Sequence, residues 1–254
     1  MKLIAYGKTD IGKKRKINED NFIIINLDTG VEGNLLEPTD VTKGLFFMVA
    51  DGLGGAVSGE IASRLAVNCA SEYIKNNFNE QSKIIMKDCL MEANRTCHNA
   101  IRENSDLHGM GTVATACLLN SQEIIISQVG DTRMYLYREE KLIQITEDQN
   151  YYNEIKKRKI KDPDIIREFG QKHIVTQAIG SMEKINPVVI ALPIQSNDKI
   201  FICSDGLHGL IELKKLNEIL SYKQSPQTTI NELIEIANEN GGTDNITGIL
   251  VELI

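Results

Sequence analysis

The segment Gly44-Leu-Phe-Phe-Met-Val-Ala-Asp51-Gly-Leu-Gly-Gly55 organises the rest of the chain. An apolar run of strand length and strand composition ends at the carboxylate of Asp51. The glycines that follow let the backbone turn closely around whatever that carboxylate holds. A single Asp-Gly pair after a strand indicates only a tight turn, so a functional interpretation depends on whether the pattern recurs.

The pattern does recur at four other aspartates. Asp131 and Asp205 follow strand-like apolar runs, and Asp20 and Asp244 stand just before such runs. One aspartate at a strand end indicates a turn, but five, counting Asp51, indicate side chains that converge. The sequence therefore predicts an acidic site at the ends of several strands.

The bulk properties are those of an ordinary single-domain protein. The chain has 254 residues, 42% of them hydrophobic and 25% charged, with no shift of composition along its length. The formal net charge of −7 argues against a nucleic-acid partner, because phosphate backbones are bound chiefly by clusters of Lys and Arg. A protein or small-molecule partner is expected instead.

The N-terminus and the cysteines bear on location and redox state. Polar residues follow Tyr6 at once, so no secretory apolar segment is seen, and no apolar run reaches membrane-spanning length. We expect a cytoplasmic monomer that does not bind membranes. The cysteines are odd in number, widely spaced and without a Cys-x-x-Cys pair, which predicts reduced core residues rather than disulfides or a zinc site; they are Cys69, Cys89, Cys97, Cys117 and Cys203.

The first half of the chain is expected to form strands and then two helices. Residues 3–10 and 22–25 can pair as a hairpin, and residues 28–42 are expected to form a loop before the strand that ends at Asp51. Ser58 can cap the first helix. Both helices show a four-residue apolar period and should lie antiparallel on one sheet; the stripes are Ile61, Leu65, Cys69 and Tyr73, then Ile85, Cys89, Ala93, Cys97 and Ile101.

The second half predicts an antiparallel meander over residues 111–119, 123–129 and 133–137. Residues 146–170 are charged and lysine-rich, and are expected to form a helical excursion that acts as a mobile flap. Strands at residues 174–176, 188–192 and 199–203 and helical segments over 207–220 should follow. A last helix, with Ile230, Leu233, Ile234 and Ala237 on one face, stops at Asn240-Gly241-Gly242 before a final strand.

The strand blocks and helix blocks are segregated, so the fold class is α+β, with antiparallel sheets packed together and helices outside.

The acidic side chains offer hard oxygen ligands, which select Mg²⁺, Mn²⁺ or Ca²⁺ over zinc or copper. Two such ions bridged by one aspartate activate a water for in-line attack on phosphorus. Arg15, beside Glu19 and Asp20, is placed to fork two phosphate oxygens. The four histidines are scattered and are expected to be structural or surface residues.

Six ordered motifs together resemble the metal-dependent protein phosphatases, the PPM or type 2C family, in a compact bacterial form. The resemblance extends from about Tyr6 to Val251. The motifs are Arg15-x-x-Asn18-Glu19-Asp20, Asp51-Gly52-x-Gly54-Gly55, Gly109-Met-Gly111-Thr112, Gly130-Asp131-Thr132-Arg133, Ser204-Asp205-Gly206 and Gly242-Thr-Asp244-Asn245.

The resemblance implies one PPM-type domain over residues 1–254, built as two antiparallel sheets between helical layers (αββα). It also implies a serine/threonine phosphoprotein phosphatase that uses two Mn²⁺ or Mg²⁺ ions, with a possible third, and acts on targets of a bacterial Ser/Thr kinase. By position, Asp51 would bridge the ions with help from the Gly52 carbonyl, and Arg15 would bind phosphate. Asp205 and Asp244 would hold the first ion, Asp20 and Glu19 would act through bound water, Asp131 would join Asp205 at the third ion, and Asn245 would support the site by hydrogen bonding.

Two positions depart from the family pattern. Leu53 stands where many eukaryotic members have His, so no side chain is assigned to protonate the leaving group, and metal-bound water is the default donor. Gln149 stands where the family often has His, and it cannot titrate.

Two other functions fit the same motifs: a regulator with a single dedicated partner, and a non-catalytic module that docks phosphoproteins or senses a metabolite. The basic run over residues 156–161 is interpreted as a solvated helix face rather than as a surface that steers acidic substrates.

Overall fold

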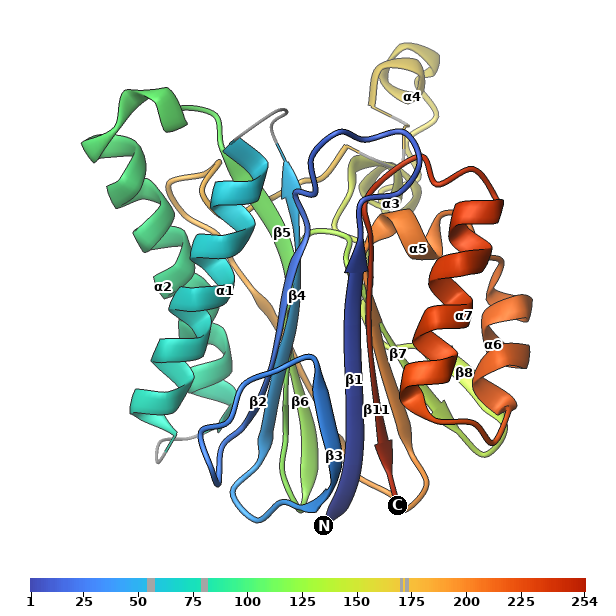
Figure 1. The fold of residues 1–254 in the computed structure, drawn as a ribbon. Coiled ribbons are helices and arrows are strands. Elements are labelled where there is room, and N and C mark those ends of the chain that lie inside the picture. The colour runs from blue at the N-terminus through green and yellow to red at the C-terminus, as the bar shows by residue number, and fades with distance from the viewer. Residues whose placement is uncertain (54–57, 79–81, 170, 172–173) are drawn as a thin grey trace.

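The computed structural model describes residues 1–53, 58–78, 82–169, 171 and 174–254. Within these residues, eleven strands form two antiparallel sheets (Figure 1). The six-stranded sheet has the order β3 (Leu35–Asp40), β1 (Lys2–Asp10), β11 (Ile246–Leu253), β10 (Lys199–Cys203), β7 (Arg133–Arg138) and β8 (Lys141–Gln144). The five-stranded sheet has the order β2 (Asn21–Asn26), β4 (Leu45–Leu53), β5 (Gly111–Leu119), β6 (Glu123–Val129) and β9 (Val188–Pro193).

Helices cover the outer face of each sheet (Figure 1). Helices α1 (Ser58–Asn77) and α2 (Ser82–Glu103) pack on the five-stranded sheet, and the short helix η1 (Ser105–Leu107) follows α2. Helices α5 (Asp205–His208), α6 (Leu213–Ser221) and α7 (Pro226–Glu239) lie on the six-stranded sheet. The predicted α+β class with an αββα order of layers is confirmed.

The strand β4 shows why the opening apolar run is unbroken. Successive side chains of a strand point to opposite faces. Phe46 and Met48 accordingly belong to the core under α1 and α2, whereas Phe47 and Val49 belong to the core between the two sheets. All four side chains have no exposed surface. Because both faces of β4 are buried, every position requires an apolar side chain up to the point where the strand reaches Asp51.

The predicted hairpin of the first two strands is wrong, because the strands belong to different sheets. Strand β1 pairs with β11 and β3, and β2 pairs with β4. The connection over residues 11–20 therefore crosses from one sheet to the other. The predicted loop over residues 28–42 contains the edge strand β3, whose side chains are mostly exposed. It accommodates Pro38 because an edge strand does not need every N–H for pairing.

The predicted meander is correct only for β5 and β6, which pair with each other. Strand β7 pairs with β10 and β8 in the other sheet, so the chain crosses between the sheets again at Gly130-Asp131-Thr132. Gly130 has φ +95°, and a Cβ there would lie 2.1 Å from a side-chain atom of Val113. The crossing therefore requires glycine. The predicted strand at residues 174–176 is only an isolated bridge from Val175 to Asn150.

The helix predictions hold, with one shift of face. The stripes predicted for α2 and α7 are buried, except that Ile101 is only partly buried. In α1 the buried stripe is Ala62, Ala66, Ala70 and Ile74, one position after the predicted one, whose residues are partly buried. Small alanines let this helix approach the sheet closely. The helix begins at Ser58, and the position before it lies outside the described residues, as do Gly54, Gly55 and Gly170.

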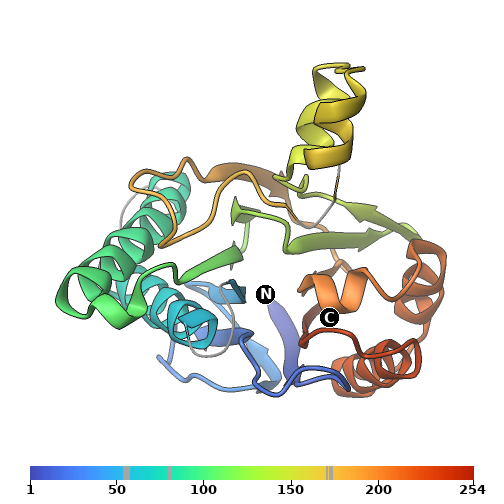
Figure 2. The ribbon, with the colours of Figure 1, turned by 90° about the horizontal axis from the view of Figure 1, so that it is seen from above.

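The segment after β8 leaves the layered body. Helices α3 (Tyr151–Lys157) and α4 (Pro163–Phe169) stand apart from both sheets (Figure 2). The predicted helical excursion is thus present, and its action as a flap remains a prediction.

All five cysteines are free, and all but the partly exposed Cys69 are buried, as predicted. None of the described helices is both long and apolar enough to cross a membrane.

Candidate metal centre

The five predicted aspartates meet at one end of the sandwich, where strands of both sheets end. Burial raises the pKa of Asp51 well above its ordinary value, and the charges of Asp20, Asp205, Asp131 and Asp244, in decreasing order, raise it further. Such mutual effects require the carboxylates to be close neighbours. The predicted convergence is therefore present in the structure, and both inter-sheet crossings contribute to it.

The same environment shifts the pKa of the other acids. Burial raises the pKa of Asp20 to about 7, against the hydrogen bonds that it accepts from Thr247 and Ser204. The pKa of Asp131 is also raised to about 7, by burial first and by the charge of Asp205 next. Burial and then Asp244 raise the pKa of Asp205. Gathered carboxylates of this kind are costly unless a cation compensates their charge.

The donor set fits a hard divalent cation, because it consists of carboxylate oxygens with the Gly52 carbonyl beside them. Among the described residues, no three acidic, histidine or cysteine side chains are yet arranged as ligands of one ion. Their oxygens have other partners: a side-chain hydrogen bond links Asp51 with Asp205, and Asp244 accepts from Arg15. Binding an ion would replace these contacts.

Glu19 provides a second observation that fits a bound cation. Its backbone N–H donates to Asn245 Oδ1 at 2.8 Å, and its side chain is buried. Among the described residues, Glu19 Oε1 is a buried atom without a hydrogen-bond partner. A buried acceptor without a donor is unfavourable, so Glu19 Oε1 is available to a water or a cation.

Asp20 is held by two hydroxyl groups that the sequence analysis assigned no role. Ser204 Oγ donates to Asp20 Oδ2 at 2.8 Å, and Thr247 Oγ1 donates to the same oxygen at 2.6 Å. The Thr247 backbone N–H in turn donates to Ser204 Oγ at 3.0 Å. These bonds tie the start of β2 to the end of β10 and to β11, so they join the two sheets at the acidic end.

Asp51 and Gly52 are fixed from the neighbouring strand. Thr112 Oγ1 donates to the Asp51 carbonyl oxygen at 2.7 Å. A Cβ at Gly52 would lie 2.5 Å from the Gly59 carbonyl oxygen and 2.6 Å from the Glu19 carbonyl oxygen. No side chain fits there, which explains the glycine that follows Asp51.

Asn245 acts as a clamp on the loop of residues 11–19. Besides accepting from Glu19, its Nδ2 donates to the carbonyl oxygens of Ile11 and Ile17, both at 3.0 Å. Asn245 is only 3% exposed. The loop that carries Arg15 is thus anchored on both sides of that arginine.

Arg15 lies at the mouth of the acidic cluster. Its Nη2 donates to Asp244 Oδ2 at 2.7 Å, and its side chain is 47% exposed. Asp244 is the first cause of the raised pKa of Arg15. A guanidinium has five N–H donors in a planar fork, so the bond to Asp244 leaves donors that can meet an incoming anion.

His208 lies at the site, although no motif in the sequence predicted it there. Its Nε2 lies 3.2 Å from the Asp131 carbonyl oxygen. Burial, followed by the charge of Arg133, lowers the pKa of His208 to about 4. The ring is therefore neutral near pH 7, and a proton on Nε2 can donate to that carbonyl. His98 touches the Met182 carbonyl oxygen instead, and His173 lies outside the described residues.

Gln149 and Arg133 steady the crossing that carries Asp131. Gly130 N donates to Gln149 Oε1 at 2.9 Å. Arg133 donates to both carboxylate oxygens of Asp148, at 2.8 and 2.7 Å. Gln149, which departs from the family pattern, therefore has a structural partner in this chain.

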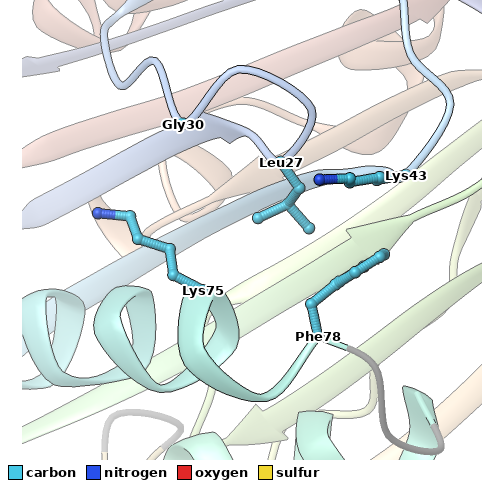
Figure 3. A pocket seen from close by; sticks show the side chains of 5 residues that line it. All are labelled: Leu27, Gly30, Lys43, Lys75 and Phe78. Carbon is cyan, nitrogen blue, oxygen red and sulfur yellow. The ribbon is translucent and has the colours of Figure 1, made fainter.

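A separate cavity of about 360 Å³ lies near the end of α1 (Figure 3). Leu27, Gly30, Lys43, Lys75 and Phe78 line it. The twenty residues of α1 span roughly 30 Å, which separates this cavity from the acidic end where the helix begins. Lys75 is paired with Glu32 and Glu72, and none of the described residues that line the cavity carries a carboxylate. We assign no chemistry to it.

Comparison with known proteins identifies a family. The sequence model for protein phosphatase 2C matches residues 38–250. The serine/threonine phosphatase stp of Listeria innocua is 31% identical over 256 residues, which cover 98% of this chain and 95% of that protein. The solved structure of the S. agalactiae serine/threonine phosphatase is 27% identical, with a TM-score of 0.84 over 99% of this chain and 100% of that one.

A second solved structure shares the fold at lower identity. It is the catalytic domain of a serine/threonine protein phosphatase, PstP, in complex with two manganese ions. Its TM-score is 0.80 at 23% identity, over 98% of each chain.

Proposed function

The chain belongs to the protein phosphatase 2C family, as its motifs predicted, and we propose that it is a metal-dependent phosphatase acting on phosphoserine and phosphothreonine in proteins. The observation that carries the proposal is that Asp51 lies close to four other aspartates, which stand at strand ends of both sheets. A similar fold that holds two manganese ions supports the choice of cofactor. We propose Mn²⁺ or Mg²⁺, with two ions and a third that binds more weakly.

We propose the residues that would hold the ions from their positions in the motifs of the family. Asp51, with the Gly52 carbonyl, would bridge them, and Asp205 and Asp244 would complete the first position. Asp20 and Glu19 would contribute through water, and Asp131 with Asp205 would hold the third ion. When bound, such ions lower the pKa of coordinated water and so supply the nucleophile for in-line attack on phosphorus.

Side chains of the protein orient the substrate. Arg15 reaches the mouth of the site on a loop that Asn245 clamps. When an ion occupies Asp244, the Arg15 guanidinium would be released from that carboxylate and would fork two phosphate oxygens. Bound in this way, the phosphoryl group would lie at the mouth of the acidic cluster, where Arg15 is.

The leaving serine or threonine oxygen needs a proton. Leu53, which follows Gly52, has none to give. His208 is neutral near pH 7, and its Nε2 already meets the Asp131 carbonyl. We therefore assign the proton to water at the site rather than to a side chain.

We also propose the cellular setting. The substrates would be proteins phosphorylated by a bacterial Ser/Thr kinase, and the enzyme would act as a cytoplasmic monomer. The net charge of −7 continues to argue against nucleic acid as a partner.

The test is hydrolysis of a phosphothreonine peptide with and without Mn²⁺, by the wild-type protein and by Asp205→Asn. We expect turnover that requires the metal and is lost in the variant. Wild-type protein that binds Mn²⁺ yet leaves phosphopeptides and an aryl phosphate intact would refute the enzyme and favour a phosphoprotein-binding module. Turnover of a single protein among many would instead indicate a regulator with one dedicated partner.

A further inference from the structure

A groove of about 470 Å³ runs along α2, between that helix and residues 182–185. The segment that leads to β9 returns past α2 (Figure 2). Arg95, His98 and Arg102 line the groove from the helix, and Lys184 lines it from the returning segment. None of these residues belongs to the acidic site. The groove thus presents basic side chains from both of its walls.

The charge of the groove differs from that of the whole chain. Three Lys and Arg side chains line it against one carboxylate, that of Glu183, although the protein as a whole carries a net charge of −7. Arg95 is held by Glu92 through two hydrogen bonds, so Arg102 and Lys184 are the cations that remain for a partner. Arg102 and Lys184 are exposed, and neither forms an ion pair with another described residue. A negatively charged partner fits this balance.

Apolar surface accompanies these charges. Met91 lines the groove and is 44% exposed, and Ile185 lines the opposite wall and is partly buried. A compact anion such as phosphate would leave this surface unused. A peptide that carries acidic and apolar side chains would use both.

Asn94 fixes the wall opposite the helix. Its Nδ2 donates to the carbonyl oxygens of Met182 and Glu183, at 3.1 and 3.3 Å, and its Oδ1 accepts from Gly180 N at 2.7 Å. The side chain of Asn94 is only 4% exposed. The groove is therefore formed before any partner arrives, which reduces the entropy lost on binding.

The same wall is connected to the acidic site. Next to Gly180, Ile179 exchanges two backbone hydrogen bonds with Thr112, at 2.9 and 2.8 Å. The Thr112 hydroxyl supports the Asp51 carbonyl. A segment lying in the groove would therefore have a fixed position relative to the carboxylates.

We propose that this groove docks an acidic segment of the phosphoprotein substrate, distant in its sequence from the phosphorylated residue. Carboxylates of the segment would meet Arg102 and Lys184, and one apolar side chain would rest on Met91 and Ile185. The inference rests on the proposed function, because it assigns to that enzyme a second contact with its substrate. Docking of this kind favours acidic substrates through affinity and association rate rather than through the chemical step.

Binding can be measured without catalysis. The probe is a fluorescein-labelled, unphosphorylated peptide rich in Asp and Glu with one Leu, followed by anisotropy at low salt. The variant is Arg102→Glu with Lys184→Glu. The control is Lys83→Glu with Lys87→Glu, which changes the net charge by the same amount at two positions of α2 that do not line the groove.

We expect the groove variant to weaken peptide binding about tenfold or more, as two lost or reversed contacts allow, and the control to change it less than threefold, roughly the effect of distant surface charge. Equal weakening in both variants would overturn the proposal, as would a wild-type protein that does not bind the peptide. Groove-dependent binding of phosphatidylserine vesicles without binding of the peptide would overturn the choice of a protein partner.

Steady-state kinetics distinguishes a failure of this docking proposal from a failure of the proposed function. A phosphothreonine peptide joined to the acidic segment should show a raised KM and an unchanged kcat in the groove variant, while hydrolysis of p-nitrophenyl phosphate stays unchanged. An unaltered KM would refute the docking role. A wild-type protein that binds the acidic peptide but hydrolyses neither substrate with Mn²⁺ would refute the proposed function and leave the groove in place.

Discussion

Replacing Asn245 tests whether the loop of residues 11–19 is held by one side chain. Asn245→Ala removes three hydrogen bonds, to Glu19 N and to the carbonyl oxygens of Ile11 and Ile17. At about 1 kcal/mol for each bond, the free energy of unfolding should fall by about 3 kcal/mol. For a chain of this length, such a loss lowers the Tm by about 6 to 12 °C.

The variant should also lose phosphate binding, because the anchored loop carries Arg15. We expect KM for a phosphothreonine peptide to rise about tenfold, equivalent to about 1.4 kcal/mol of binding, with a smaller change in kcat. Urea denaturation of the metal-free protein measures the stability, and steady-state kinetics at saturating Mn²⁺ measures KM.

Two further variants sharpen this test. Asn245→Asp keeps the size and the acceptor for Glu19 N, but it faces two carbonyl oxygens with an acceptor, so it should be at least as damaging as alanine. Asn231→Ala removes a bond from Lys8 on the partly exposed face of α7 and should change stability by no more than about 0.5 kcal/mol. If the free energy of unfolding fell no more in Asn245→Ala than in Asn231→Ala, or if KM were unaltered in Asn245→Ala, then Asn245 would not be the residue that anchors the loop.

Three other outcomes follow from the site. Arg15→Ala should raise KM for phosphopeptides, and Arg15→Lys should not restore it, because an ammonium group cannot fork two oxygens; steady-state kinetics decides this. Thr112→Val keeps the shape but removes the bond to the Asp51 carbonyl, so isothermal titration should show weaker Mn²⁺ binding while circular dichroism stays unchanged. Raised pKa values of about 7 at Asp20 and Asp131 mean that the folded protein retains protons that the unfolded chain loses above about pH 4. The metal-free protein should therefore lose stability as the pH rises from 4 to 7, and calorimetry that shows a rising Tm over this range would contradict the assignment.

The acidic residues were predictable because their signal is local. Each aspartate adjoins an apolar run whose length and composition already indicate a strand. The helices α2 and α7 were predictable for the same reason, since their apolar period is carried by neighbouring turns. In α1 the period was visible but the predicted face was shifted by one position, because the buried residues Ala62, Ala66 and Ala70 are small and give a weaker apolar signal than the larger residues beside them.

Strand pairing was not predictable, because it depends on contacts distant in sequence. The two wrong pairings, of β1 with β2 and of β6 with β7, both fall where the chain crosses from one sheet to the other. A short link normally indicates a hairpin, and the sequence alone does not show that these links change sheets. The edge strand β3 was missed because its side chains are mostly exposed and it contains Pro38.

The hydroxyl groups around Asp20 could not be found from the sequence either. Ser204 and Thr247 are ordinary residues near the ends of strands, and only the folded arrangement aims both at one carboxylate oxygen. The presence of Ser204 in the motif Ser204-Asp205-Gly206 was the one hint in the sequence. Supporting residues of this kind carry no pattern of their own, in contrast to the aspartates that they hold.

These two groups of residues differ in what they contribute to stability. The aspartates crowd like charges into a poorly solvated site, which destabilises the metal-free fold, whereas Asn245, Ser204 and Thr247 stabilise it through buried hydrogen bonds. Asp51→Asn should therefore abolish turnover and raise the Tm of the metal-free protein, because the substitution removes one of the crowded charges. Asn245→Ala should impair activity and lower that Tm. Mn²⁺ should raise the Tm of the wild-type protein more than that of Asp51→Asn, since an ion that binds only the folded state stabilises it in proportion to its affinity. Thermal shifts of the same sign in both variants without metal would show that Asp51 is a structural residue rather than a ligand.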